Sequence, residues 1–198
     1  MIDIRNIFFK YRGITPLPFV ILLIVQSDMT RWGLISGLVL AAIGELIRIS
    51  GVRVAGGRTR TRKVGAKKLC TGGIYSYVRN PLYLGNVIIY MGFALFAGGP
   101  WVFYLMFIAL IYIAFQYGMI ISLEEKTLAD LFGEDYQEFK KNVPRLFPRL
   151  TAWQPDKTIE RVSWIKVFRS EKSTLINQCF FLIVVLIKEI MVYKLHVI

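Results

Sequence analysis

The chain has 198 residues, 55% of them hydrophobic, and a formal net charge of +12. Its mean hydropathy of +0.51 is too high for an ordinary soluble domain. Many basic residues stand in short blocks beside apolar runs, as membrane topology signals do, which argues against a nucleic-acid partner. We therefore expect an all-α integral membrane protein surrounded by membrane lipids.

Five apolar runs are expected to be membrane-spanning helices, since each is near the length that crosses the hydrocarbon core. The first follows basic residues but has no small-residue cleavage site after it, so we expect a retained helix and not a signal peptide. The third and fourth are joined only by Gly-Gly-Pro, which predicts an antiparallel hairpin whose far ends meet. In chain order, the runs cover residues 14–26, 32–54, 83–97, 101–122 and 175–193.

The connecting segments predict the orientation. Residues 56–80 hold seven basic residues and no acid, so the positive-inside rule places this loop in the cytosol. The N-terminus and residues 123–174 then share that side. Residues 124–142 repeat apolar positions near a period of 3.6 and predict a helix, whereas 151–173 mix aromatic and basic residues, typical of a helix in the interface plane.

We accordingly divide the chain into three parts. Residues 1–66 hold the first membrane helices and the basic loop, 67–150 the hairpin and a cytosolic helix, and 151–198 the interfacial segment and fifth span. The two cysteines, Cys70 and Cys179, have no metal-ligand spacing and are expected to be free thiols.

Two charged pairs fall inside the apolar runs. Glu45 and Arg48 are three residues apart on one helical face and can neutralise each other, so a structural role is favoured over a functional one. Lys188 and Glu189 lie near the end of the fifth run, where long side chains can reach the interface.

The predicted hairpin brings residues 79–83, Arg-Asn-Pro-Leu-Tyr, beside Glu124 and Glu125. Pro81 suits the first turn of a helix, where free N–H groups can receive an anion with help from Arg79. Two adjacent carboxylates need a cation, which an amine, a sulfonium or a buried arginine would supply. Alternatively, the glutamates only begin a cytosolic helix.

Three motifs resemble the isoprenylcysteine carboxyl methyltransferase and phospholipid methyltransferase superfamily over residues 67–150. They are Lys-Lys-Leu-Cys-Thr-Gly-Gly-Ile-Tyr at 67–75, Arg-Asn-Pro-Leu-Tyr-Leu-Gly at 79–85, and the Glu-Glu pair followed by Phe132-Gly133, Tyr136 and Val143-Pro144-Arg145. The resemblance implies an enzyme that methylates a lipid or lipidated substrate at the cytosolic face, using S-adenosylmethionine and no metal.

The resemblance also implies the site residues. We take Glu125, Tyr83 and Arg79 as candidate catalytic residues. The implied S-adenosylmethionine contacts are Lys67, Lys68, Leu69, Cys70, Tyr75, Asn80, Pro81, Leu82, Tyr83, Glu124 and Glu125.

Two departures from the superfamily pattern affect the substrate side. Asn80 stands where histidine is usual, and Ile120 where the carboxyl methyltransferases tend to have an arginine, which weakens a prenylcysteine substrate. The only histidine, His196, lies at the C-terminus, so an acceptor amine would have to lose its proton to Glu125, Tyr83 or water.

Two other functions stay open. One is an NADPH-dependent membrane reductase of the sterol reductase type, although a nicotinamide phosphate would prefer cations to the Glu-Glu pair. The other is a non-catalytic membrane protein that retains the fold. The sequence predicts neither the methyl acceptor nor the oligomeric state.

Overall fold

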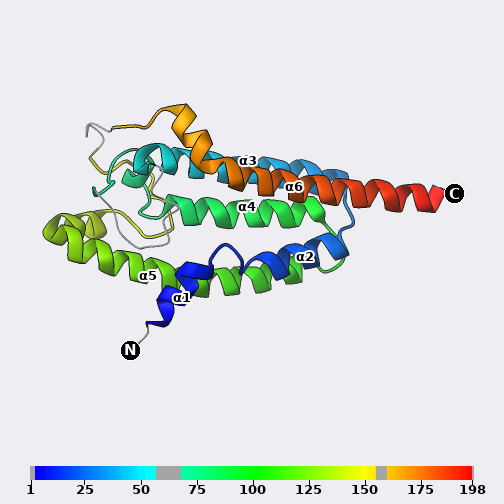
Figure 1. Ribbon diagram of the computed structural model, residues 1–198, viewed down its shortest axis with the longest axis horizontal. Coiled ribbons are helices and arrows are strands. Elements are labelled where there is room, and N and C mark those ends of the chain that lie inside the picture. The colour runs from blue at the N-terminus through cyan, green and yellow to red at the C-terminus, as the bar shows by residue number, and fades with distance from the viewer. Residues whose placement is uncertain (1–2, 57–67, 155–159, 198) are drawn as a thin grey trace.

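The computed structural model describes residues 3–56, 68–154 and 160–197, which form a helical bundle without strands (Figure 1). The all-α expectation is confirmed. The elements are α1 (Ile4–Tyr11), α2 (Leu17–Gln26), α3 (Arg31–Ala55), the 3-10 turn η2 (Gly73–Ser76), α4 (Pro81–Ala97), α5 (Val102–Asn142) and α6 (Trp164–Val197).

Three of the described helices, α3, α5 and α6, are long and apolar enough to cross a membrane, which supports an integral membrane protein. Large apolar side chains such as Phe103, Phe107 and Phe115 are mostly exposed along α5, where lipid would cover them. The helices α2 and α4 are apolar but shorter. At 1.5 Å per residue, α2 covers about half of the hydrocarbon core, so five spans stay a prediction.

Two long helices differ from the expected boundaries. The fourth span and the expected cytosolic helix form one helix, α5, interrupted only at Gly133, whose φ of 51° is left-handed. The prediction of a separate interfacial helix within 151–173 is wrong, because α6 begins at Trp164 and continues without a break into the fifth span. Trp153 instead packs on Phe139, with ring centroids 5.7 Å apart.

The closest helix pair is α3 with α4, which lie side by side in Figure 1. A Cβ atom placed on Gly85 would lie 2.6 Å from the Gly44 carbonyl oxygen, and one on Gly92 would lie 2.6 Å from the Ala41 nitrogen. Small residues therefore let the two backbones touch, which is a common device where lipid removes the hydrophobic drive for helix association.

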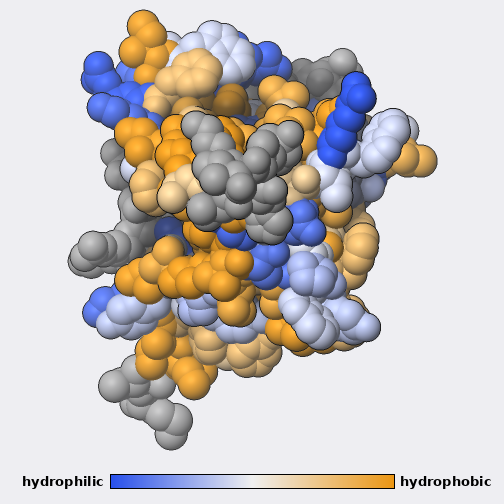
Figure 2. Space-filling view, turned by 90° about the vertical axis from the view of Figure 1, so that its right-hand side faces the viewer, coloured by the Kyte–Doolittle hydropathy of each residue, from blue (hydrophilic) through white to orange (hydrophobic). Residues whose placement is uncertain are grey.

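The bundle has two ends, which we name by their content. The site end is where α3 finishes and α4 begins, and the opposite end holds the turn between α4 and α5. Figure 2 looks onto the opposite end, where hydrophilic and hydrophobic side chains are interspersed. At that turn Gly98 and Gly99 have φ of 64° and 98°, and Cβ atoms there would strike the carbonyl oxygens of Asp28 and Gln26.

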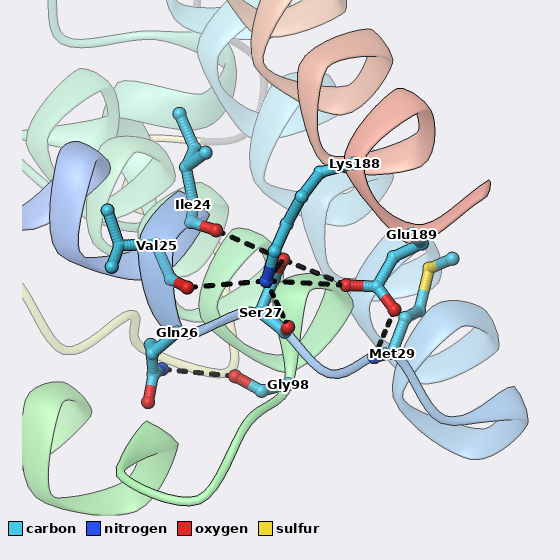
Figure 3. A network of polar contacts seen from close by, with 8 residues as sticks. All are labelled: Ile24, Val25, Gln26, Ser27, Met29, Gly98, Lys188 and Glu189. Carbon is cyan, nitrogen blue, oxygen red and sulfur yellow. Dashed lines mark hydrogen bonds and ion pairs between the residues drawn. The ribbon is translucent and has the colours of Figure 1, made fainter. Parts of the chain in front are cut away.

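Lys188 and Glu189 also bind this opposite end (Figure 3). The Lys188 Nζ donates to the carbonyl oxygens of Ser27 and Val25, at 2.5 and 3.3 Å. The Glu189 carboxylate accepts from the Ser27 hydroxyl at 2.9 Å and from the Met29 N–H at 3.2 Å. This pair therefore fastens α6 to the turn between α2 and α3 and is not simply exposed at an interface.

Candidate functional site

The far ends of α4 and α5 meet at the site end, as the hairpin predicted. The Tyr83 hydroxyl, in the first turn of α4, donates a hydrogen bond to Glu124 Oε1 on α5 at 2.9 Å. The Tyr83 ring also packs against the ring of Tyr117, which lies on α5 before Glu124. The two ring centroids are 4.7 Å apart. Tyr83 is thereby held between two residues of the partner helix and aimed at Glu124.

Glu125 is buried and neutralised by two arginines. Its Oε1 lies 3.0 Å from Arg79 Nη2 and accepts from Arg145 Nε at 3.1 Å, and its Oε2 contacts Arg145 Nη2. Arg79 also donates to the Lys140 carbonyl at 2.9 Å. Of the cations that the sequence left open, a buried arginine is therefore the one that Glu125 has.

Glu124 has a different environment although it is the next residue. It is half-buried and makes no ion pair with any residue that the structure describes; its hydrogen bond comes from Tyr83. Burial raises the pKa of the Glu124 carboxyl to about 7, while the hydrogen bond from Tyr83 and the charge of Arg12 act in the opposite direction. A carboxylate held by a neutral hydroxyl keeps most of its capacity to bind a further cation.

The start of α4 has the features of an anion site. Pro81 is the first helical residue, as predicted, and Asn80 precedes it without capping the helix through its side chain. The Asn80 amide instead donates to the Arg145 carbonyl at 3.1 Å. The N–H groups of the first turn therefore lack a side-chain acceptor from Asn80, and the helix dipole favours a negative group there.

Several predicted contacts, from the η2 loop and the first turn of α4, belong to one apolar cluster. Leu69, Cys70, Tyr75 and Leu82 pack together with residues of the last part of α5. Burial raises the pKa of the Tyr75 hydroxyl, and the nearby Cys70 and Glu124 add to the increase. Burial also raises the pKa of the Cys70 thiol. The Tyr75 hydroxyl and the Cys70 thiol are therefore neutral near pH 7. Cys70 and Cys179 are free thiols, as expected.

Two lysines of the predicted set are placed differently. Lys67 lies outside the residues that the structure describes. Lys68 is exposed and pairs with Glu160 across 2.6 Å, a hydrogen bond that raises the pKa of the lysine and lowers that of the glutamate. Lys68 also lines a polar cavity of about 490 Å³ at the site end.

Thr71 lines the same cavity and was missed by the sequence reasoning. The residue is 4% exposed, and its hydroxyl has no hydrogen-bond partner among the residues that the structure describes. The other polar and aromatic residues of the lining are Phe132, Asp135, Glu138, Trp153 and Gln154. The only signal in the sequence is a hydroxyl residue directly before the Gly72-Gly73 pair of the matched motif. An unsatisfied buried hydroxyl on a residue that lines a polar cavity fits a ligand that supplies the missing partner.

A second buried polar cluster lies deeper in the bundle. Arg48 pairs with Glu45 at 3.4 Å, which confirms the predicted neutralisation, and also with Glu171 of α6. Arg48 contacts the side-chain oxygen Oδ1 of Asn86, and the side-chain Nδ2 of Asn86 donates to the Tyr117 hydroxyl at 3.2 Å. Because Tyr117 packs on Tyr83, this cluster connects α3 and α6 to the residue that holds Glu124.

Ile120, where related carboxyl methyltransferases tend to have arginine, is fully buried in an apolar cluster with Ile113 and Ile121. The apolar surroundings offer no place for a charged side chain without rearrangement. The packing around this position therefore suits isoleucine and not the arginine of the superfamily pattern.

The sequence pattern of the phospholipid methyltransferase family matches residues 32–135, just over half of the chain. The chain belongs to the phospholipid methyltransferase family. The match runs from the start of α3 to the second half of α5 and so includes the η2 loop, Tyr83 and both glutamates. It confirms the superfamily that the motifs indicated.

Individual relatives of this family member are similar over shorter shares. Methanethiol S-methyltransferase 1 of Bradyrhizobium diazoefficiens is 36% identical over 38% of this chain and 24% of its own length. Protein-S-isoprenylcysteine O-methyltransferase of Schizosaccharomyces pombe is 32% identical over 57% and 48%. Methanethiol S-methyltransferase of Pseudomonas deceptionensis is 34% identical over 60% and 42%. The chain thus spans less than half the length of these relatives, and no solved structure matches it.

Proposed function

We propose that this phospholipid methyltransferase family member transfers a methyl group from S-adenosylmethionine to a lipid or lipidated acceptor at the cytosolic face of the membrane. The observation that carries the proposal is the unequal treatment of the two adjacent glutamates. Arginines neutralise Glu125, whereas Glu124 accepts a hydrogen bond from the Tyr83 hydroxyl and forms no ion pair among the described residues. Glu124 is therefore the carboxylate that is left to bind a cationic ligand.

The residues at the site end fit such a donor. S-adenosylmethionine supplies a methyl group on a positively charged sulfonium and carries an ammonium, a carboxylate, ribose hydroxyls and adenine. Glu124 would hold one of the cationic groups, and the first turn of α4 would hold the carboxylate. The Thr71 hydroxyl and the carboxylates of Asp135 and Glu138 can bond ribose hydroxyls, and Trp153 offers an aromatic face.

The candidate catalytic residues differ in what their contacts favour. Arg79 and Glu125 hold each other, so we assign them to positioning, because two guanidinium contacts keep Glu125 charged and disfavour proton uptake. Tyr83 orients Glu124. Methyl transfer is an in-line displacement in which the protein mainly aligns donor and acceptor and excludes water.

The relatives named above act on different acceptors, methanethiol in two cases and isoprenylcysteine in the third. We favour a lipid acceptor because the site lies at the end of helices whose outer faces are apolar and exposed. Incubation of the purified protein with membrane lipids and S-adenosylmethionine, followed by mass spectrometry, should reveal a lipid heavier by one methylene group. Methylation of methanethiol alone would overturn the lipid assignment and keep the methyl transfer.

Isothermal titration of the detergent-solubilised protein with S-adenosylmethionine tests the donor. We expect binding to the unmodified chain, loss of binding in Glu124→Gln, and unchanged binding in Glu134→Gln, which removes an exposed carboxylate on the same helix. A folded protein that binds NADPH instead would favour the reductase alternative. A folded protein that binds neither ligand would favour the non-catalytic alternative.

A further inference from the structure

We propose that a second cavity at the site end, separate from the donor residues, binds the phosphate of an anionic membrane phospholipid. The cavity has a volume of about 500 Å³ and lies between the last turns of α3, the η2 turn and the start of α6. None of the predicted donor residues lines it. It is therefore a different site from the cavity beside Thr71, and the inference does not depend on the proposed methyl transfer.

The two arginines of this cavity, the half-buried Arg53 and the exposed Arg161, differ from the arginines of the bundle that pair with glutamates. Arg48, Arg79 and Arg145 each pair with a glutamate. Arg53 and Arg161 form no ion pair within the described part of the chain, and no acidic residue lines the cavity. Two guanidinium groups thus face a shared cavity without a counter-charge, which fits an anionic ligand.

The Arg53 side chain is held in position, but its hydrogen-bonding capacity is not fully used by the described residues. Its guanidinium lies over the Trp164 ring, 4.0 Å from the centroid, and its carbonyl accepts from the Val162 N–H at 2.9 Å. Its Nε is buried and has no hydrogen-bond partner within the described part of the chain. A ring face stabilises a cation without accepting its hydrogen bonds, so the fork of Arg53 is oriented and still free to bind phosphate oxygens.

The polarity of the lining changes along α3 as it does along a lipid molecule. Arg53, Ser50 and Ile47 are spaced by three residues on one face of the helix and line the cavity in that order. The charged and apolar ends are separated by roughly 9 Å of helix rise. Beyond Ile47 the exposed Leu46 and Ile43 continue an apolar surface towards the middle of α3.

This gradient favours a phospholipid over a soluble phosphate. The phosphate would lie between Arg53 and Arg161, hydroxyls of Ser50 and Tyr77 would bond the glycerol region, and an acyl chain would follow α3. Trp164, about half exposed, stands where aromatic side chains anchor helices at a membrane interface. Basic sites between membrane helices near the cytoplasmic surface commonly bind anionic lipid headgroups.

Native mass spectrometry of the full chain, released from detergent with defined lipids, tests the proposal. The probes are phosphatidylglycerol, phosphatidylcholine with the same acyl chains, and glycerol 3-phosphate, which has the headgroup phosphate without chains. We expect preferential retention of phosphatidylglycerol. Arg53→Gln and Arg161→Gln should each weaken it about tenfold, the loss of a charge-assisted hydrogen bond. Arg169→Gln, which removes an exposed charge from α6 outside the cavity, should not.

Several outcomes would overturn the proposal. Equal retention of phosphatidylglycerol and phosphatidylcholine would show that Arg53 and Arg161 do not select an anionic lipid. Equal binding of glycerol 3-phosphate and the lipid would indicate a soluble phosphate ligand. If the Arg53→Gln variant does not fold, the test rests on Arg161→Gln, which changes an exposed residue. Lipid retention by Arg161→Gln equal to that by Arg169→Gln would then refute the site. S-adenosylmethionine binding, measured on the same samples, separates these results from failure of the proposed methyl transfer.

Discussion

The two ends of the bundle satisfy their polar groups to different degrees. At the opposite end, Lys188 and Glu189 find hydrogen-bond partners on the turn between α2 and α3 (Figure 3). At the site end, buried polar atoms of Thr71, Arg79 and Arg53 have no hydrogen-bond partner in residues 3–56, 68–154 and 160–197. Within the described residues, the opposite end contains no such atom.

We propose that this difference distinguishes polar groups that hold the fold, such as Glu189, from groups that a ligand would pair, such as the Thr71 hydroxyl. Native proteins pair nearly all buried polar groups, because an unpaired one has lost its water without replacement. A paired group such as the Glu189 carboxylate stabilises the folded protein through its hydrogen bonds to Ser27 and Met29. The Thr71 hydroxyl gains no such stability from the described residues, so under the proposed donor site the two kinds of group should respond oppositely to substitution.

The largest expected effect is at Glu125. Replacing Glu125 with Gln would leave Arg79 buried without its carboxylate, and breaking a buried pair in this way typically costs about 3–5 kcal/mol of stability. Thermal and denaturant unfolding in detergent would measure the loss, with Glu134→Gln as the exposed control. A change no greater than that of the control would show that the arginines do not depend on Glu125.

At the opposite end, Glu189→Gln should reduce stability by about 1–3 kcal/mol, since charged hydrogen bonds to Ser27 and Met29 are weakened. The affinity for S-adenosylmethionine should stay unchanged, because this end is remote from the site. Unfolding curves and titrations on the same preparation would measure both quantities. Loss of donor affinity with stability unchanged would contradict the division of roles between the two ends.

Thr71→Val should have the reverse signature. Removing an unsatisfied hydroxyl should leave the melting temperature unchanged or slightly raised, while donor affinity falls about tenfold through loss of one hydrogen bond. Thr127→Val is the matched control, because the Thr127 hydroxyl already donates to the Leu123 carbonyl at 3.0 Å. Equal donor affinity in both variants would place Thr71 outside the donor site.

The smallest effect is expected at the exposed pair of Lys68 and Glu160. Both side chains are largely in solvent, where screening removes most of an ion pair's contribution. Glu160→Gln should therefore leave the melting temperature unchanged within error. A clear drop that disappears at high salt would show that this pair fastens the segment before α6 to the loop that contains Lys68.

Several features followed from local sequence alone. Pro81 begins α4 because proline lacks the N–H that a first helical residue leaves unused. The short link at residues 98–100 forces α4 and α5 to turn back, which brings Tyr83 to Glu124. Arg48 pairs with Glu45 because three residues nearly complete a helical turn.

Other features depend on residues far apart in the chain. The 151–173 segment was expected to lie along the interface, but Trp164 stacks on Arg53 and Phe168 at the start of a continuous α6. No local pattern predicts that Arg145 reaches Glu125 or that Glu171 reaches Arg48. The orphan hydroxyl of Thr71 is visible only when its surroundings are complete.

The sequence by itself determined the membrane class, the superfamily and the meeting of residues 79–83 with the Glu-Glu pair, because hydropathy, motif and loop length are properties of short stretches. Only the tertiary structure decided which glutamate is neutralised. Glu124 and Glu125 are chemically identical and adjacent, and their difference arises because Arg79 and Arg145 converge from two separate segments on Glu125 alone.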